Sequence, residues 1–150
     1  MTLQRKLQPI GSRQLQQVGA QHPRAKYALD LIGNTTPNRH RHFVAEGLWA
    51  HNVILGAQTP VDTFFWCPEA VYSDEVRTRA DEIAARAGRT YQISPKVLER
   101  LAERDRPDGL VSIAQMPSWD PAELPLGRSA LVLAADAIEI PGNLGTLIRT

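Results

Sequence analysis

Apolar and polar residues along the chain follow two periods, which predict strands alternating with helices between residues 42 and 115. Short runs rich in β-branched and aromatic residues predict the strands, and apolar residues spaced three or four apart predict the helices. The expected strands cover 42–46, 61–67, 89–93 and 110–115, and the expected helices cover 24–32, 47–55, 74–87 and 95–101. Because strands alternating with helices form βαβ units, this order predicts an α/β fold around a largely parallel sheet.

Capping residues predict several helix ends. Ser73 and Ser94 stand where a serine caps the first turn of a helix. Gly33 and Asn34 are expected to end the first long helix in the left-handed conformation. Ser12 is expected to cap a short helix that extends to Val18.

Aromatic residues and the single cysteine lie mostly in apolar surroundings. The run Phe64-Phe65-Trp66 within an expected strand predicts core packing rather than a stacking platform, and Trp49 is interpreted in the same way. Cys67 has no basic residue near it in sequence that would activate a nucleophile. We therefore look for function elsewhere in the chain.

A proline-rich segment divides the sequence. Residues 116–127 contain three prolines, which predict an extended connector. We expect an N-terminal domain at 1–116, a linker at 117–128 and the start of a second domain at 129–150. In this last part the apolar run 130–135 predicts a buried strand, followed by a loop and the beginning of a helix.

Composition narrows the class of protein and its partners. The 150 residues carry a formal net charge of +1, with 43% hydrophobic and 22% charged residues, which is typical of a soluble globular protein. No stretch is long and apolar enough for a membrane span, and the N-terminus lacks the apolar core of a secretory signal. A single cysteine fits a reducing compartment, so we expect a cytoplasmic protein.

Charge is unevenly distributed. Residues 1–51 contain seven basic and two acidic side chains, whereas residues 52–150 contain ten basic and fourteen acidic ones. A basic N-terminal third indicates either an anionic partner, most simply nucleic acid, or an arginine-rich surface without a partner.

The densest cationic cluster gives the candidate contacts with nucleic acid. It is the sequence Arg39-His40-Arg41-His42, and Arg24 and Lys26 extend it. Because alternate residues of a strand share a face, either the two arginines or the two histidines form the working pair. The histidines have no cysteine or carboxylate cluster at ligand spacing, so we expect no metal site.

The last ten residues, Pro141-Gly142-Asn143-Leu144-Gly145-Thr146-Leu147-Ile148-Arg149-Thr150, carry the second candidate. Gly142 and Gly145 allow a ligand or another segment to approach the backbone, and amides at a helix N-terminus attract anions. Asn143 stands where a helix can be capped, and it can share a pocket with Arg149 if it precedes the helix. An ordinary strand–loop–helix corner with a surface arginine is the alternative.

This ending resembles the first signature motif of the SpoU/TrmH group of RNA ribose 2′-O-methyltransferases, which belong to the SPOUT superfamily. Residues 43–47, preceded by basic residues, are similar to the opening strand of that group's RNA-binding domain, and residues 108–114 are similar to its last strand. The proline-rich connector falls where the group links its two domains. The resemblance covers residues 8–150.

The resemblance implies a small three-layer α/β/α domain, similar to certain ribosomal proteins, that binds ribosomal or transfer RNA. A second domain with a trefoil knot would bind S-adenosylmethionine and pair into a homodimer. Asn143 and Arg149 match the group's catalytic asparagine and arginine, and Gly142 and Gly145 match its motif glycines. The arginine is thought to orient or activate the ribose hydroxyl.

The sequence departs from the group in two respects. The motifs that form the knot and hold the methyl donor are expected beyond Thr150, so we expect this chain to be a truncated N-terminal portion, inactive alone and without a cofactor site. Ala137 and Ile140 replace the glycine and the acidic residue that relatives often carry. A ribosomal-protein-like RNA-binding module without enzymatic activity is the competing interpretation. A nucleotide-binding α/β protein lacks support, because there is no dinucleotide fingerprint or P-loop.

Overall fold

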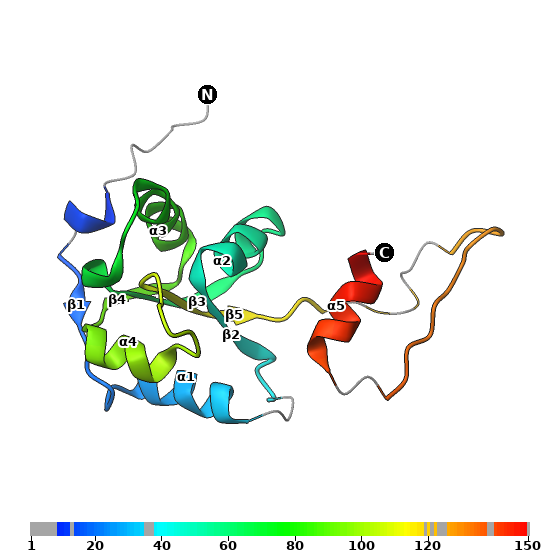
Figure 1. Cartoon of the computed structure of the whole chain (residues 1–150), viewed down its shortest axis with the longest axis horizontal. Helices are drawn as coiled ribbons and strands as arrows, with labels where there is room; N and C mark the ends of the chain where they lie inside the picture. The colour runs from blue at the N-terminus through cyan, green and yellow to red at the C-terminus, as the bar shows by residue number, and fades with distance from the viewer. Residues whose placement is uncertain are drawn as a thin grey trace. The chain divides into compact units, whose positions relative to one another are not determined.

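The computed structural model describes residues 9–12, 14–34, 38–118, 120, 122, 126–137 and 140–149. The chain divides into two compact units, Met1–Pro117 and Ser118–Thr150, and each is treated by itself (Figure 1). The helices and strands of the first unit are η1 (Ile10–Ser12), β1 (Gln16–Gln17), α1 (Pro23–Gly33), β2 (His42–Glu46), α2 (Gly47–Gly56), β3 (Val61–Trp66), η2 (Pro68–Ala70), α3 (Asp74–Arg86), β4 (Arg89–Gln92), α4 (Pro95–Leu101) and β5 (Leu110–Gln115). From α1 to β5, every long element predicted from the sequence is confirmed to within one residue at each end.

Two local predictions are wrong, and a third is confirmed only in part, because Ser94 stands at the N-cap of α4 but its side chain makes no capping hydrogen bond. Ser12 caps no helix extending to Val18, because Gln16 and Gln17 form β1 and pair with β4 instead. The short η1 turn before it is tied to α3, since Asp81 accepts a hydrogen bond from the Ile10 amide. At the end of α1, Asn34 is extended (φ −123°, ψ 114°), so the helix ends without the left-handed conformation.

The sheet has the order β1-β4-β3-β5-β2, with β1, β4 and β3 paired in parallel. β5 lies between β3 and β2 and is antiparallel to both, so four strands share a direction and β5 opposes them. The prediction of a largely parallel sheet misses this reversal. The strand reverses because α4 is only about 10 Å long, too short to carry the chain back to the opposite end of the sheet. After α4, at Glu103, the chain still lies beside Glu46 at the end of β2, where the Glu103 amide donates to the Glu46 carboxylate. β5 therefore starts at that end of the sheet.

Helices cover both faces of the sheet, with α2 and α3 on one side and α1 and α4 on the other (Figure 1). Along β3, Phe64 and Trp66 pack with the α2 and α3 layer, whereas Phe65 packs with the α1 and α4 layer. All three are buried, which confirms that the aromatic run belongs to the core. Burial on both faces explains why consecutive residues of β3, from Phe64 to Trp66, are all apolar and do not alternate with polar ones.

β5 enters the sheet through a close backbone contact. Gly109 has φ +85°, and a Cβ added there would lie 2.5 Å from the carbonyl oxygen of Cys67. The Cys67 amide in turn donates to the Gly109 carbonyl at 3.0 Å. A glycine is required here for both its conformation and its lack of a side chain.

A buried polar pair joins α2 to β5. His51 is fully buried; its Nδ1 lies 2.7 Å from the Gly47 carbonyl, and its Nε2 lies 2.8 Å from the Ser112 hydroxyl. Burial lowers the pKa of His51 from its ordinary value of 6.5. The neutral ring donates from Nδ1 to the carbonyl and accepts the Ser112 proton at Nε2, which satisfies both nitrogens.

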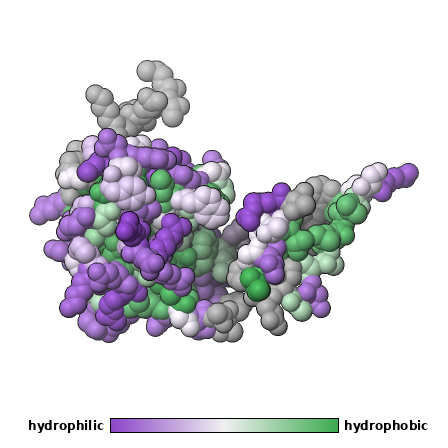
Figure 2. Space-filling view, viewed as in Figure 1, coloured by the Kyte–Doolittle hydropathy of each residue, from purple (hydrophilic) through white to green (hydrophobic). Residues whose placement is uncertain are grey.

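The second unit contains one described helix, α5 (Pro141–Arg149). The predicted buried strand at 130–135 is wrong for this structure, because these residues are extended but exposed, with Leu131 97% accessible. They form the apolar, green run within this unit in Figure 2. A strand needs hydrogen-bonding neighbours, and the described residues of the second unit include no other strand.

None of the described helices has the length and apolar character needed to cross a bilayer.

Replacing Gly109 with alanine should destabilise the first unit by about 2 kcal/mol or more, because the left-handed conformation and the clash with the Cys67 carbonyl both oppose a methyl group. Gly56→Ala is the matched control, since nothing lies within 4 Å of an added Cβ there. Urea denaturation of both variants measures the difference. Equal stabilities would show that the contact at Gly109 is not tight.

The stability of the fold should fall as pH decreases below about 6.5. His51 has a lowered pKa in the folded state, so the unfolded chain takes up a proton before the folded chain does. This contribution is fully present above the unfolded pKa and is lost by at most about 1.4 kcal/mol per pH unit below it. Urea denaturation at about pH 7.5 and about pH 5.5 should show a smaller pH dependence for His51→Gln. An unchanged dependence in that variant would contradict the assignment.

Candidate nucleic-acid interface

A tight turn places the cationic segment at the start of β2. The Arg41 amide donates to the Asn38 carbonyl at 2.9 Å, and Arg41 adopts the left-handed conformation with φ 52°. The Asn38 side chain then binds both backbone groups of His42: its Oδ1 accepts from the amide at 3.0 Å, and its Nδ2 donates to the carbonyl at 2.7 Å. The Met116 amide donates to the Arg41 carbonyl at 2.7 Å, which continues the β2–β5 pairing. The conformation of the turn is thus fixed from both sides.

Three rings gather above this turn. His40 and His42 are stacked, with centroids 5.9 Å apart and planes inclined by 21°. Tyr27, from α1, meets both edge-on, at 6.4 Å from His40 and 5.9 Å from His42. Its hydroxyl lies 3.0 Å from Nδ1 of His42. Burial, and secondly the charge of Asp62, raise the pKa of Tyr27, so the hydroxyl keeps its proton.

These rings line a cavity of about 380 Å³, which we call the aromatic pocket. It is bounded by Arg24, Tyr27, His40, His42 and Asp62. Arg24 Nη1 lies 2.8 Å from Asp62 Oδ2, so one cation of the pocket is already paired. The pocket therefore offers aromatic faces together with an ion pair.

The predicted contact residues occupy different places around the aromatic pocket. The sequence left open which alternate pair works together, and the structure brings the two histidines together. Arg39 is exposed, with Nε 3.4 Å from Nε2 of His40, and Arg41 is exposed and donates to the Pro117 carbonyl at 3.1 Å. Lys26 is exposed on α1 but does not line the pocket.

Sequence analysis missed Tyr27 and Asp62. Tyr27 follows Arg24 by three residues on one helix, a spacing that places both side chains on the same face and could have pointed to it. Asp62 comes from β3, and no local signal in the sequence connects it with α1.

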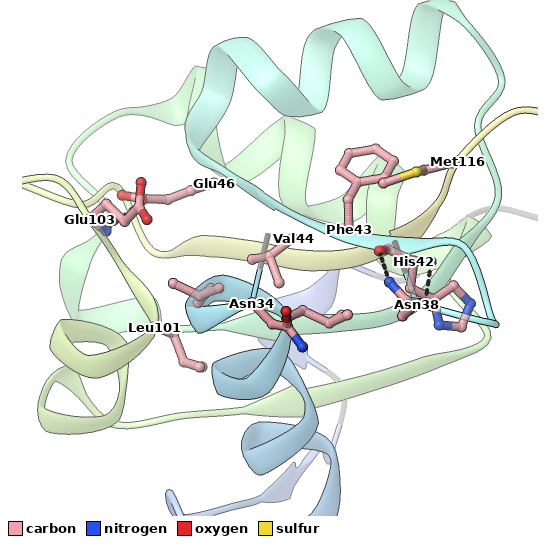
Figure 3. Close-up of a pocket in the computed structure, with 11 residues that line it drawn as sticks. Asn34, Asn38, His42, Phe43, Val44, Glu46, Leu101, Glu103 and Met116 are labelled. Atoms are coloured by element: carbon pink, nitrogen blue, oxygen red, sulfur yellow. Dashed lines mark hydrogen bonds between the residues drawn. The ribbon is translucent and has the colours of Figure 1, made fainter. Parts of the chain in front are cut away.

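A second cavity, of about 310 Å³, follows the outer edge of β2, and we call it the edge pocket (Figure 3). Leu31 and Ile32 of α1, Val44 of β2 and Leu101 of α4 give it an apolar wall.

Carboxylates lie at one end of the edge pocket. Glu46 Oε2 accepts from the Glu103 amide at 2.8 Å, while its buried Oε1 has no partner among the described atoms. Figure 3 shows both glutamates at the end opposite Asn38 and His42. These carboxylates repel phosphate, and no described arginine or lysine lines the edge pocket, whereas Asp62 in the aromatic pocket is paired with Arg24. The aromatic pocket is therefore the candidate for binding nucleic acid.

Trp49 is 69% exposed, so the prediction that it belongs to the core is wrong. The buried face of α2 carries His51, Ile54 and Leu55. Trp49 precedes His51 by two residues, which turns its side chain about 200° away around the helix.

Cys67 and the possible metal ligands are the remaining reactive side chains among the described residues of the first unit. Cys67 is buried, and burial together with Glu69 raises the pKa of its thiol to about 11. Within the described ranges, no three His, Cys, Asp or Glu side chains lie close enough to hold a metal ion.

In the second unit, α5 carries the terminal motif. Asn143 lies inside the helix, in its first turn, and its amide donates to the Ile140 carbonyl at 3.0 Å. It does not precede the helix, so it and Arg149 point about 120° apart around the axis. Arg149 folds back along the helix, and its Nη1 would be 3.3 Å from a Cβ at Gly145. The missing side chain at Gly145 provides the room for this guanidinium.

No family model matches the chain. It is 33% identical over 84 residues to an uncharacterized tRNA/rRNA methyltransferase of Synechocystis, a match that covers 56% of this chain and 30% of that protein. It is 32% identical over 82 residues to the 23S rRNA (guanosine(2553)-2′-O)-methyltransferase RlmP of Bacillus subtilis, covering 55% and 30%. The crystal structure of an RNA 2′-O ribose methyltransferase superposes with a TM-score of 0.66 at 27% identity, over 90% of this chain and 50% of that one. In sequence and in fold the chain is therefore similar to RNA methyltransferases.

These similarities agree with the resemblance to RNA methyltransferases noted in the sequence. A SpoU methyltransferase from Streptomyces viridochromogenes, AviRb, in complex with AdoMet, shares the fold at a TM-score of 0.52 and 21% identity. The α/β class and the five-stranded sheet agree with the SpoU fold. The chain spans about a third of the curated relatives and half of the first superposed structure.

Proposed function

We propose that this chain is the RNA substrate-binding portion of an S-adenosylmethionine-dependent 2′-O-ribose methyltransferase that acts on ribosomal or transfer RNA. The observation that carries the proposal is the exposed turn with Arg39 and Arg41, which we call the cationic turn. It lies beside the aromatic pocket, in a chain similar to RNA methyltransferases. RlmP is named for a guanosine of 23S rRNA, which supports RNA as the class of substrate.

Arg39 and Arg41 supply the main phosphate contacts in this proposal. Both are exposed, and a guanidinium binds phosphate oxygens through paired hydrogen bonds. Lys26 extends the contact along α1 as a point charge. Arg24 contributes less to phosphate binding, because it is paired with Asp62, which also lies 3.6 Å from Arg89 Nη1. His40 and His42, stacked on each other, lie within the same contact.

The proposal assigns the catalytic contribution to Asn143 and Arg149. A ribose 2′-hydroxyl is a poor nucleophile at neutral pH, so it has to be positioned and deprotonated as the methyl group is transferred. A guanidinium on the neighbouring phosphate can hold the nucleotide in place. Arg149, lying over Gly145, keeps its guanidinium beside exposed backbone where a phosphate can reach it.

The described residues do not form a site for S-adenosylmethionine. Gly142 and Asn143 are exposed, and so are the apolar side chains Leu144, Leu147 and Ile148 of α5. We propose that the full-length enzyme, as a cytoplasmic homodimer, binds the methyl donor, and that this chain alone does not transfer methyl groups.

Replacing Arg39 and Arg41 together with alanine should weaken RNA binding on the order of tenfold at low salt. The slope of log K against log salt should decrease by about 2, since about one counterion is released per phosphate contact. Fluorescence anisotropy with a structured rRNA fragment at several salt concentrations measures both quantities.

The matched control is Arg77→Ala with Lys96→Ala, which removes the same charge from exposed sites on α3 and α4. If the control weakens binding as much as the turn variant, then net charge and not the turn governs RNA binding. If the wild-type chain does not bind RNA at all, the proposed function is wrong.

Isothermal titration of the 150-residue chain with S-adenosylmethionine should show no binding, because the exposed α5 offers no enclosed site for an adenosine or a methionine group. A known S-adenosylmethionine-dependent methyltransferase serves as the positive control for the titrant. Saturable binding to this chain would contradict the proposal.

A further inference from the structure

We propose that the aromatic pocket receives one unpaired nucleobase of the bound RNA, so that the substrate is RNA with an unstacked nucleotide and not a continuous duplex. This inference rests on the proposed function and names the class of RNA that it recognises. It follows from the ring geometry and not from the net charge.

Aromatic faces are available in the pocket. Neither histidine belongs to the core: His40 is exposed and His42 is half-buried. Their stacked rings and the edge of Tyr27 surround a cavity of about 380 Å³, within the range of pockets that hold small ligands. Flat aromatic walls are suited to a planar ring, and bases of unpaired RNA stack on such side chains.

The polar groups of the pocket suit the edge of a base. Arg24 and Asp62 are about three-quarters buried and held together at 2.8 Å, which places N–H donors beside a carboxylate acceptor. Nucleobases carry donors and acceptors side by side on their edges. An isolated phosphate would instead favour an unpaired cation, and Asp62 would repel it.

A paired base cannot enter such a pocket. In an RNA duplex the bases are stacked, and the major groove is too deep and narrow for side chains to read. The guanidinium groups of Arg39 and Arg41 lie outside the pocket, where they can hold the phosphates on either side of a base turned out of the stack. Because these two charges lie beside the pocket, we expect its ligand to be a base within an RNA chain and not a free nucleotide.

The rings are held in place before a ligand binds. Asn38 fixes the backbone of His42, and the Tyr27 hydroxyl fixes its ring through Nδ1. His40 is the freer partner, because it lies on the turn and is exposed. His40 is therefore the residue whose replacement tests the pocket without disturbing the core.

The test compares two RNA hairpins that differ by one bulged adenosine, using the whole 150-residue chain. His40→Ala should weaken binding to the bulged hairpin about tenfold and leave binding to the fully paired hairpin unchanged. His40→Phe should restore binding, since it restores an aromatic face. Lys26→Ala is the control for charge, since Lys26 is exposed and does not line the pocket, and it should weaken binding to both hairpins equally.

A fluorescent adenine analogue, 2-aminopurine, placed at the bulge reports stacking directly. Its fluorescence should be quenched by the wild-type chain and by His40→Phe but not by His40→Ala. Adenosine monophosphate should compete only weakly for the bulged hairpin.

Equal losses on the two hairpins, or no loss, in His40→Ala would overturn the pocket assignment. If Lys26→Ala still weakens binding to both hairpins, the proposed RNA-binding function survives without the pocket. Adenosine monophosphate binding as tightly as the bulged hairpin would overturn recognition of an RNA chain. Failure of the wild-type chain to bind either hairpin would overturn both proposals.

Discussion

The contact between Gly109 and the Cys67 carbonyl determines where β5 enters the sheet, and the rest of the first unit depends on that strand. β5 joins β3 to β2, is buried from Leu110 to Ala114, and runs against both neighbours. Its last hydrogen bonds continue to Met116, whose amide holds the Arg41 carbonyl. β5 therefore positions the cationic turn at its C-terminal end. The position of β5 itself is determined at its N-terminal end, where only a glycine fits at residue 109.

Local elements could be predicted because their causes are local. The Ser73 side chain caps α3 through the Val76 amide as expected, and apolar runs mark β3 and β5. The direction of β5 depends on where the chain lies after α4. The spacing of apolar residues in the sequence does not predict that position. Trp49 shows the same limit, because an apolar side chain on a short helix is buried only if the neighbouring layer reaches its face.

The candidate interface could be predicted only in part for a similar reason. Charge density in the sequence identifies the segment that begins at Arg39, since four consecutive residues carry cationic or titratable side chains. The aromatic pocket is assembled from α1, the turn and the start of β3, so Tyr27 and Asp62 become visible only in the fold. The role of α5 stays a prediction from the resemblance, and the helix places Asn143 and Arg149 on different faces.

Folding also changes the meaning of the charge asymmetry. The basic first third of the sequence has few acidic residues of its own, but Asp62 from the acidic remainder folds against Arg24 and pairs with it. Beside the pocket, Arg39 and Arg41 form a small exposed cationic rim, and Lys26 is exposed on α1. Such a rim attracts any RNA backbone and cannot distinguish one sequence or structure from another. Discrimination between RNAs therefore has to come from groups that contact bases, and in the described part of the first unit the exposed rings beside the rim are the groups placed to do so.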